Sequence, residues 1–255
     1  MKTISMALCP VLSNRSIAAG VHDIWLETPQ AELARAGQFV EISCEGHLLR
    51  RPISICEIDA KKARLRLLIE ERGRGTHALG QVRPGETMNL LAPLGNGFPI
   101  VDATKTVVLV GGGIGTPPLL EASKPFAGHA DAILGFRSLK NVVLQEDFKK
   151  AGVPATIATE DGSFGKAGFV TRPLEERLKK PCDVIFACGP LPMLKAVAGL
   201  ANRANIPCFV SMEARMACGI GACLSCAITV RRDGREQYLH VCKNGPVFDA
   251  NEIVW

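Results

Sequence analysis

Four cysteines near the C-terminal end constrain this chain more than any other feature. Cys218, Cys223 and Cys226 follow one another with the spacing C-x4-C-x2-C, and fifteen residues separate Cys226 from Cys242. Four thiolates at this plant-type spacing hold a two-iron, two-sulfide (2Fe–2S) cluster. Structural zinc also uses four thiolates, but its sites more often show two short C-x2-C pairs. The spacing therefore favours an iron–sulfur cluster bound by these four residues, with zinc as the alternative.

Two glycines between the first cysteines suit such a cluster. Gly219 and Gly221 lack a Cβ, so the backbone N–H groups around them can approach the sulfur atoms closely. Most of the other cysteines are dispersed in apolar or strand-like surroundings, where a free thiol behaves as a small buried hydrophobe. This distribution predicts one metal site in a protein of the reducing cytoplasm. The dispersed cysteines are Cys9, Cys44, Cys56, Cys182 and Cys208.

Composition excludes several other classes of protein. The 255 residues carry a net charge of only +5, with Lys and Arg scattered and no basic tract, so binding to nucleic acid has little support. The longest apolar run with a strand-like pattern, VVLVGGGIG at 107–115, is far shorter than a membrane span. The N-terminal stretch has one Lys but no clear cleavage site, and it suits a first β-strand better than a signal peptide.

The first of three regions, 1–101, predicts a small antiparallel barrel. Short β-rich runs at 37–43 (GQFVEIS), 64–70 (RLRLLIE) and 87–92 (TMNLLA) are punctuated by Gly and Pro. Long helical periodicity does not occur between them. Strands at this spacing are typical of an antiparallel barrel.

The second region, 102–207, alternates apolar strands with helices. Such alternation predicts a parallel, doubly wound sheet. A helix is expected at 192–204 after the last strand. The expected strands are 106–110, 132–136, 155–159 and 183–187.

The third region, 208–255, is a compact segment that holds the four clustered cysteines. It contains one hairpin-like stretch at 227–241, with Asp233-Gly234 at its turn. We therefore expect a small C-terminal domain around the metal site, giving three domains in all.

A glycine-rich loop follows the first apolar strand of the second region. Thr116 suits a helix N-cap and Pro117 the first helical position, so the loop is expected to open a helix, where a pyrophosphate can bind. The fingerprint G-x-G-x-x-G is not met, because Thr116 stands where the third Gly would be, and Asp131 precedes a strand instead of ending one. A tight strand-to-helix turn without a ligand is the alternative. The glycines are Gly111, Gly112, Gly113 and Gly115.

Three further segments are candidate nucleotide contacts. Cys188 ends the last apolar strand, where ligands of open parallel sheets bind, so it can face a nicotinamide or be merely buried. In the first region, Arg51 offers a fork of donors for a pyrophosphate, and Gly75 and Thr76 offer backbone and hydroxyl donors. Taken alone, these residues fit an ordinary surface Arg and glycine turn equally well.

The order of motifs along the chain favours nucleotide binding by these residues. RPIS, LIE, GRGTHAL, GGGIGTPPL, ATEDGSFG and ACGPLPML occur in the order found in the ferredoxin-reductase-like flavoproteins. The closing segment, MACGIGACLSCAI followed by CKNGPVF, closely resembles one branch of them, the electron-transfer subunits of type B dihydroorotate dehydrogenase. The resemblance covers nearly the whole chain, and the cysteine segment is its most specific part.

The resemblance implies a FAD-binding barrel (1–101), an NAD-binding α/β domain (102–207) and a 2Fe–2S domain (208–255). It makes Cys218, Cys223, Cys226 and Cys242 the cluster ligands, and it places NAD near 111–116, the 159–162 loop and Cys188. The FAD contacts it implies are Arg51, Pro52, Ile53, Ser54, Leu68, Ile69, Glu70, Gly75 and Thr76.

The implied function is that of an oxidoreductase component in pyrimidine biosynthesis. A partner catalytic subunit carrying FMN would oxidise dihydroorotate, and this chain would pass the electrons through the cluster and FAD to NAD⁺, in a heterotetramer with two copies of each subunit. No catalytic base is nominated in this chain. An autonomous or bifurcating NAD(P)H:ferredoxin-type reductase flavin subunit is the first alternative. A zinc-stabilised binding module without redox activity is the second.

Overall fold

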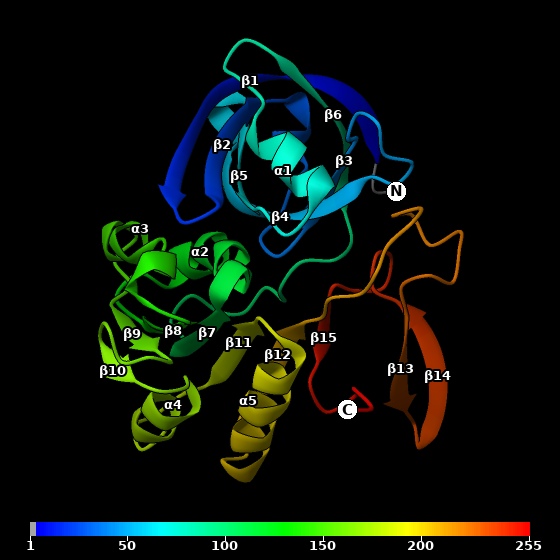
Figure 1. Cartoon of the computed structure of the whole chain (residues 1–255). Helices are drawn as coiled ribbons and strands as arrows, with labels where there is room; N and C mark the ends of the chain where they lie inside the picture. The colour runs from blue at the N-terminus through cyan, green and yellow to red at the C-terminus, as the bar shows by residue number, and fades with distance from the viewer. Residues whose placement is uncertain (1–3) are drawn as a thin grey trace.

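The computed structural model describes residues 4–255 and has three parts (Figure 1). A barrel built from the N-terminal strands lies above a sheet flanked by helices, and a hairpin lies beside that sheet near the C-terminus. The predicted fold class, a barrel followed by a doubly wound sheet and a small C-terminal part, is confirmed. Among the described residues, no helix is long and apolar enough to cross a membrane.

The barrel closes in the strand order β1-β2-β5-β4-β3-β6, and all of its pairings are antiparallel. Inward-facing apolar side chains such as Ile24, Ile55 and Leu67 fill its interior. The strands predicted at 37–43, 64–70 and 87–92 are all present. The six strands are β1 (Ser5–Ala18), β2 (Val21–Glu27), β3 (Phe39–Ile42), β4 (Arg51–Asp59), β5 (Arg64–Glu70) and β6 (Thr87–Leu94).

The central sheet has the order β10-β9-β8-β7-β11-β12-β15, and only the edge strand β15 is antiparallel to its neighbour. Every strand predicted in the second region belongs to it. The crossovers run through helices, which confirms the alternation read from the sequence. The strands are β7 (Val107–Gly112), β8 (Ala130–Phe136), β9 (Ala155–Thr159), β10 (Lys166–Ala167), β11 (Val184–Cys188), β12 (Cys208–Ser211) and β15 (Val247–Asp249).

Helices cover both faces of this sheet, and alternate residues of each strand point to different faces. On β7, Val108 and Val110 pack in one core with residues of α4 and α5, whereas Val107 and Leu109 pack in another with residues of α2 and α3. This two-faced burial explains why the strands are apolar throughout. The helices are α2 (Pro117–Ser123), α3 (Gln145–Lys150), α4 (Thr171–Arg177) and α5 (Leu191–Arg203).

The segment 208–255 is shared between the sheet and a hairpin. Strands β12 and β15 join the central sheet, so this sheet extends past the boundary expected at 207/208. Between them, β13 (Ala227–Arg232) and β14 (Arg235–His240) form the expected hairpin. Its turn residues Asp233 and Gly234 both have positive φ, as a type I′ turn requires. The division into three domains stays a prediction.

A buried arginine ties the barrel to the sheet. Arg66 on β5 donates to Asp23 within the barrel at 2.8 Å and to Asp147 on α3 at 2.7 Å. Glu57 on β4 accepts from the same guanidinium at 2.5 Å and also pairs with Lys124, which follows α2. The planar guanidinium satisfies three carboxylates at once. This network fixes the barrel against one side of the sheet.

Candidate functional site: a cavity at the strand ends and a cysteine segment

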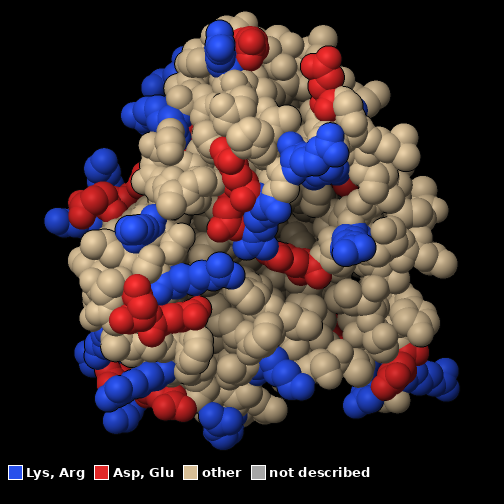
Figure 2. Space-filling view, in the orientation of Figure 1, with Lys and Arg blue, Asp and Glu red and all other residues tan. Residues whose placement is uncertain are grey.

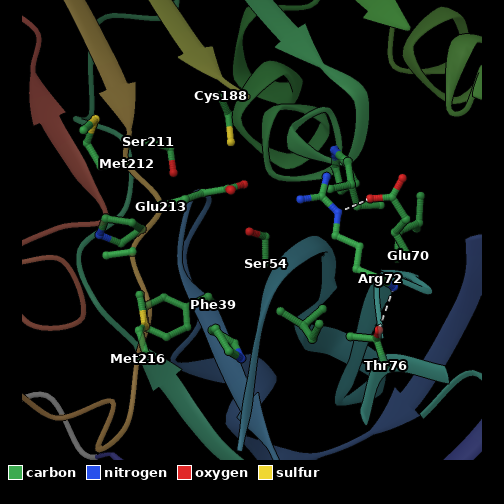
Figure 3. A pocket seen from close by; sticks show the side chains of 17 residues that line it. Phe39, Ser54, Glu70, Arg72, Thr76, Cys188, Ser211, Met212, Glu213 and Met216 are labelled. Carbon is green, nitrogen blue, oxygen red and sulfur yellow. Dashed lines mark hydrogen bonds and ion pairs between the residues drawn. The ribbon is translucent and has the colours of Figure 1, made fainter. Parts of the chain in front are cut away.

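A cavity lies between the barrel and the carboxyl ends of the central strands, and Figure 2 shows the molecule hollowed there, with charged side chains at the rim. Its walls come from the barrel strands, from the start of α2 and from the residues after β12 (Figure 3). The structure therefore brings together residues that are far apart in the sequence. The predicted contacts that line the cavity are Pro52, Ile53, Ser54, Leu68, Glu70, Thr76 and Cys188.

Strand alternation decides which of the predicted barrel residues face this cavity. On β5, Leu68 and Glu70 point outward and line it, whereas Ile69 between them is fully buried in the barrel core. The side chain of Ile69 therefore does not reach the cavity. Only its backbone is left for a ligand.

Arg51 and Gly75 pack directly against each other beside the cavity. A Cβ added to Gly75 would lie 2.6 Å from Arg51 Nε, so a side chain there would displace the guanidinium from the start of α1 (Arg74–Gly80). Thr76, in the same turn, accepts a hydrogen bond from the Arg72 backbone N–H at 2.8 Å. The Arg72 side chain pairs with Glu70 (Figure 3). The Arg51 guanidinium thus stands beside the first helical turn, a suitable place for a phosphate group.

The ends of β11 and β12 place a thiol and a hydroxyl side by side. Cys188 pairs in register with Gly111 on one side and Ser211 on the other. Burial raises the pKa of the Cys188 thiol to about 12, Glu213 adds to the rise, and Ser211 opposes it. Cys188 is therefore a neutral thiol at physiological pH and not a nucleophile.

Glu213 completes this group and was missed in the sequence. Two residues after β12, it points into the cavity toward Cys188 and Ser54 (Figure 3). Burial raises the pKa of its carboxyl group, Arg72 opposes the rise, and Glu70 adds to it. Its position at the carboxyl end of a parallel strand could have predicted this role. The strand β12 has only four residues, however, and its sequence lies in the segment expected to form the C-terminal domain.

The glycine loop after β7 packs tightly on the turn that follows β11. A Cβ on Gly115 would lie 2.6 Å from the Cys188 carbonyl carbon, and one on Gly112 would lie 2.6 Å from Met193 Sδ. Ile114 and Pro117, and not the predicted glycines, line the cavity beside it. These glycines allow the close approach of two loops, and Gly113 has a positive φ of 53°.

The prediction that the Thr116 side chain caps the helix is wrong. Pro117 does begin α2, but Thr116 has helical dihedral angles and its side chain makes no capping hydrogen bond. A short 3₁₀ turn at Gly113–Gly115 precedes the helix, so the chain is already helical at Thr116. Its hydroxyl is buried and has no hydrogen-bond partner among the described residues. The 159–162 loop, at the carboxyl end of β9, does not line the cavity.

The four clustered cysteines fall into two pairs. Cys226 and Cys242 are buried, and their Sγ atoms lie 3.2 Å apart. Cys218 and Cys223 are half-buried, and the Cys218 sulfur accepts from the Ala222 backbone N–H at 3.3 Å. All ten cysteines of the chain are free thiols. Among residues 4–255, no group of three or more His, Cys, Asp or Glu side chains is arranged to hold a single metal ion.

Backbone donors around Cys218 favour its thiolate. Burial raises the pKa of this thiol, but the N–H groups of Ile220, Cys223 and Ala222 and the Cys223 side chain outweigh burial and lower it to about 6. Burial and the neighbouring Cys226 instead raise the pKa of Cys242 to about 12. Cluster ligands are thiolates, and hydrogen bonds to sulfur accompany them. The Cys218 surroundings fit such a ligand.

Two glycines hold this segment close to Lys243 and Glu41. Gly219 and Gly221 have positive φ values of 66° and 79°. A Cβ on Gly221 would lie 2.5 Å from Lys243 Cδ, next to Cys242, and one on Gly219 would lie 2.5 Å from a carboxylate oxygen of Glu41. Burial raises the pKa of Glu41, and Arg50 opposes the rise. The donor set and this close-packed backbone fit an iron–sulfur cluster.

Comparisons with known proteins bear on the fold and on the cysteine segment. Residues 213–254 match the family described as the iron-sulfur cluster binding domain of dihydroorotate dehydrogenase B. A solved structure of an NADH-dependent reduced ferredoxin-NADP oxidoreductase superposes with a TM-score of 0.86 at 29% identity, covering 98% of this chain and 90% of that one. A ferredoxin reductase of carbazole 1,9a-dioxygenase shares the fold with a TM-score of 0.68 at 19% identity, covering 80% of this chain and 67% of that one.

The barrel, the doubly wound sheet and the cavity between them define a ferredoxin-reductase-like protein with a C-terminal iron–sulfur binding region. Two curated relatives are electron transfer subunits of dihydroorotate dehydrogenase B (NAD(+)). The one from Caldanaerobacter subterraneus is 40% identical over 96% of this chain and 97% of its own, and the one from Bacillus pumilus is 42% identical over 97% of both. The chain belongs to this family of electron transfer subunits.

Proposed function

We propose that this chain carries electrons from the oxidation of dihydroorotate, performed by a partner catalytic subunit, to NAD⁺. The observation that carries the proposal is the presence of two separate redox-suited sites in one chain. One is a cavity at the strand ends, and the other is a four-cysteine segment. The family relationship over nearly the full length supports the same role.

The proposed path runs from FMN of the partner through a 2Fe–2S cluster and FAD to NAD⁺. A cluster transfers one electron at a time, nicotinamide accepts two, and flavin exchanges both. In this proposal Cys218, Cys223, Cys226 and Cys242 bind the cluster. The cavity binds the flavin against barrel residues such as Ser54 and Leu68.

Residues of this chain bind and orient the nucleotides. Arg51 would hold the FAD pyrophosphate with its guanidinium fork, beside Thr76 and the start of α1. Cys188, at the end of β11, lines the cavity, where the nicotinamide ring would bind. The neutral Cys188 thiol and the Glu213 carboxyl group would offer hydrogen-bonding groups there.

The pyrimidine chemistry belongs to the partner in this proposal. We propose a complex with a catalytic subunit, because the relatives are named as electron transfer subunits, and two copies of each chain in a heterotetramer, as the family resemblance implies. None of the ten cysteines forms a disulfide, which is consistent with a reducing cytoplasm, where we place the protein.

Reconstitution tests the proposal. The isolated chain should reduce artificial acceptors with NADH but should not oxidise dihydroorotate. Adding the matching FMN-containing subunit should create dihydroorotate:NAD⁺ activity, and both chains should elute together in gel filtration. Turnover of dihydroorotate by the lone chain would contradict the proposal.

An autonomous or bifurcating NAD(P)H:ferredoxin-type flavin subunit is the second candidate. The close superposition on a reduced ferredoxin-NADP oxidoreductase favours it. It requires full activity with ferredoxin and no binding to the dihydroorotate dehydrogenase subunit. The same gel filtration and a ferredoxin reduction assay distinguish the two functions.

A further inference from the structure

Glu41 is a buried carboxylate without a hydrogen bond. It lies on β3, where the side chains of Val40 and Ile42 fill the barrel and that of Glu41 points out of it. The residue is only 1% exposed, and among the described residues neither of its carboxylate oxygens has a hydrogen-bond partner. An unpaired carboxylate in such a place is unfavourable for folding, so its presence calls for a functional explanation.

The carboxylate is directed at the cysteine segment, which Figure 1 draws in orange beside the barrel. A Cβ built on Gly219 would lie 2.5 Å from Glu41 Oε2 and 2.9 Å from Oε1. The carboxylate therefore rests against the backbone between Cys218 and Cys223. Gly219 has a φ of 66° and no side chain, both of which this approach requires.

A cation near Glu41 partly offsets burial, which raises the pKa of the carboxyl group. Arg50 donates from Nη1 to the Glu41 backbone oxygen at 3.2 Å and to the Asn89 backbone oxygen at 3.1 Å, and from Nη2 to Asn89 Oδ1 at 2.8 Å. None of these hydrogen bonds reaches the Glu41 carboxylate. The guanidinium therefore supports the ionised form by its field and leaves both oxygens directed at the segment.

We propose that Glu41 is a positioning residue that holds a negative charge against the cysteine segment and thereby lowers the reduction potential of the cluster. This inference rests on the proposed 2Fe–2S site. Reduction adds negative charge to a cluster, and nearby charge, hydrogen bonds and solvent exposure set cluster potentials. A carboxylate in a water-poor place opposes that added charge more strongly than a surface carboxylate would.

A redox titration followed by electron paramagnetic resonance tests the proposal on the intact chain. Glu41→Gln keeps the shape and removes the charge, so the cluster midpoint potential should shift to a more positive value. Glu41→Asp keeps the charge and should restore most of the wild-type potential. Glu27→Gln is the matched control, because Glu27 is an exposed carboxylate on β2, which does not adjoin β3 in the barrel. Its potential should equal that of the wild type.

An unchanged or more negative potential in Glu41→Gln would overturn the proposal. Because the titration reports only cluster-bearing molecules, it remains informative if the variant assembles fewer clusters. Iron and labile-sulfide analysis of the wild type comes first. Stoichiometric zinc without sulfide there would overturn both the proposed function and the role of Glu41, whereas a full cluster with an unchanged potential in Glu41→Gln would overturn the role of Glu41 alone.

Discussion

The cavity and the cysteine segment position their functional groups by opposite means. In the cavity, Cys188 and Ser211 end two regular parallel strands, so ladder register fixes their separation. In the cysteine segment, positive-φ glycines and backbone N–H groups around Cys218 replace regular structure. The same side chain consequently has a pKa of about 12 at Cys188 and about 6 at Cys218. Burial dominates at Cys188, whereas the backbone N–H groups around Cys218 outweigh burial and favour its thiolate.

The largest effect is expected from removing one ligand of the cysteine segment. Cys223→Ser should abolish or strongly destabilise the cluster, because it replaces a thiolate. Wild-type protein purified without oxygen should contain about two irons and two labile sulfides per chain. Cys182→Ser is the control and should keep the full content, since Cys182 lies outside the segment. Equal iron and sulfide in both variants would show that Cys223 is not a ligand.

Thiol alkylation sharpens the contrast between the two cysteines. In metal-free protein at pH 7, Cys218 should be mostly thiolate, whereas Cys188 should be almost entirely the neutral thiol. A thiolate of lower pKa is intrinsically less nucleophilic. After allowing for this, Cys218 should still react about 100-fold faster than Cys188 or more. The Cys218 rate should fall as the pH is lowered through 6, because protonation removes the thiolate. Peptide mass spectrometry over time measures both rates. Similar reactivity in the folded protein would contradict the assignment, whereas unfolded protein should show similar rates as the control.

A smaller effect is expected at the cavity. Arg51→Ala should weaken FAD binding by about 1.5–3 kcal/mol, the range for a hydrogen bond to a charged group, or about 10- to 150-fold. Arg51→Lys should restore binding only partly, because ammonium lacks the bidentate fork. Flavin retention during dialysis or titration calorimetry measures the loss. Arg83→Ala, an exposed change after α1, should bind FAD as the wild type does. Tight flavin binding by Arg51→Ala would remove Arg51 from the site.

The smallest effect concerns the hydroxyl of Thr116 in the glycine loop. Thr116→Val replaces a buried, unpartnered oxygen with a methyl group, so thermal stability should be unchanged or higher by up to about 1 kcal/mol. Thr116→Ser keeps the hydroxyl and serves as the control. A clear loss of stability in Thr116→Val alone, measured by thermal unfolding, would mean that the oxygen is satisfied after all.

Sequence patterns predicted the regular elements well because burial is periodic within them. Strands β5 and β9 have the predicted bounds, and the hairpin turns at Asp233 and Gly234 as expected. The residues around the cavity were harder to predict. Arg72 and Glu213 meet there only because a barrel and a sheet pack together, and no local period encodes that contact.

The boundary expected at 207/208 and the cap expected at Thr116 differ from the structure because both depend on packing between distant segments. Strand β12 has four residues and β15 three, too few to show a pattern in the sequence, yet pairing with β11 and with each other makes them part of the sheet. Thr116 looked like a cap because of its type and its Pro neighbour. The preceding 3₁₀ turn, which depends on packing of the glycines against Cys188, removed the need for a cap.

The pairing of β12 with β15 affects how far unfolding can spread when the metal site is lost. The cysteine segment and the hairpin form one excursion that leaves the sheet at Ser211 and returns to it at Val247. Both ends of the excursion are therefore anchored in the same rigid core, and disorder between them need not spread. We expect loss of metal to open this excursion alone, with amide exchange accelerating there while the barrel stays protected. A damaged centre can then be rebuilt on a chain that never unfolds.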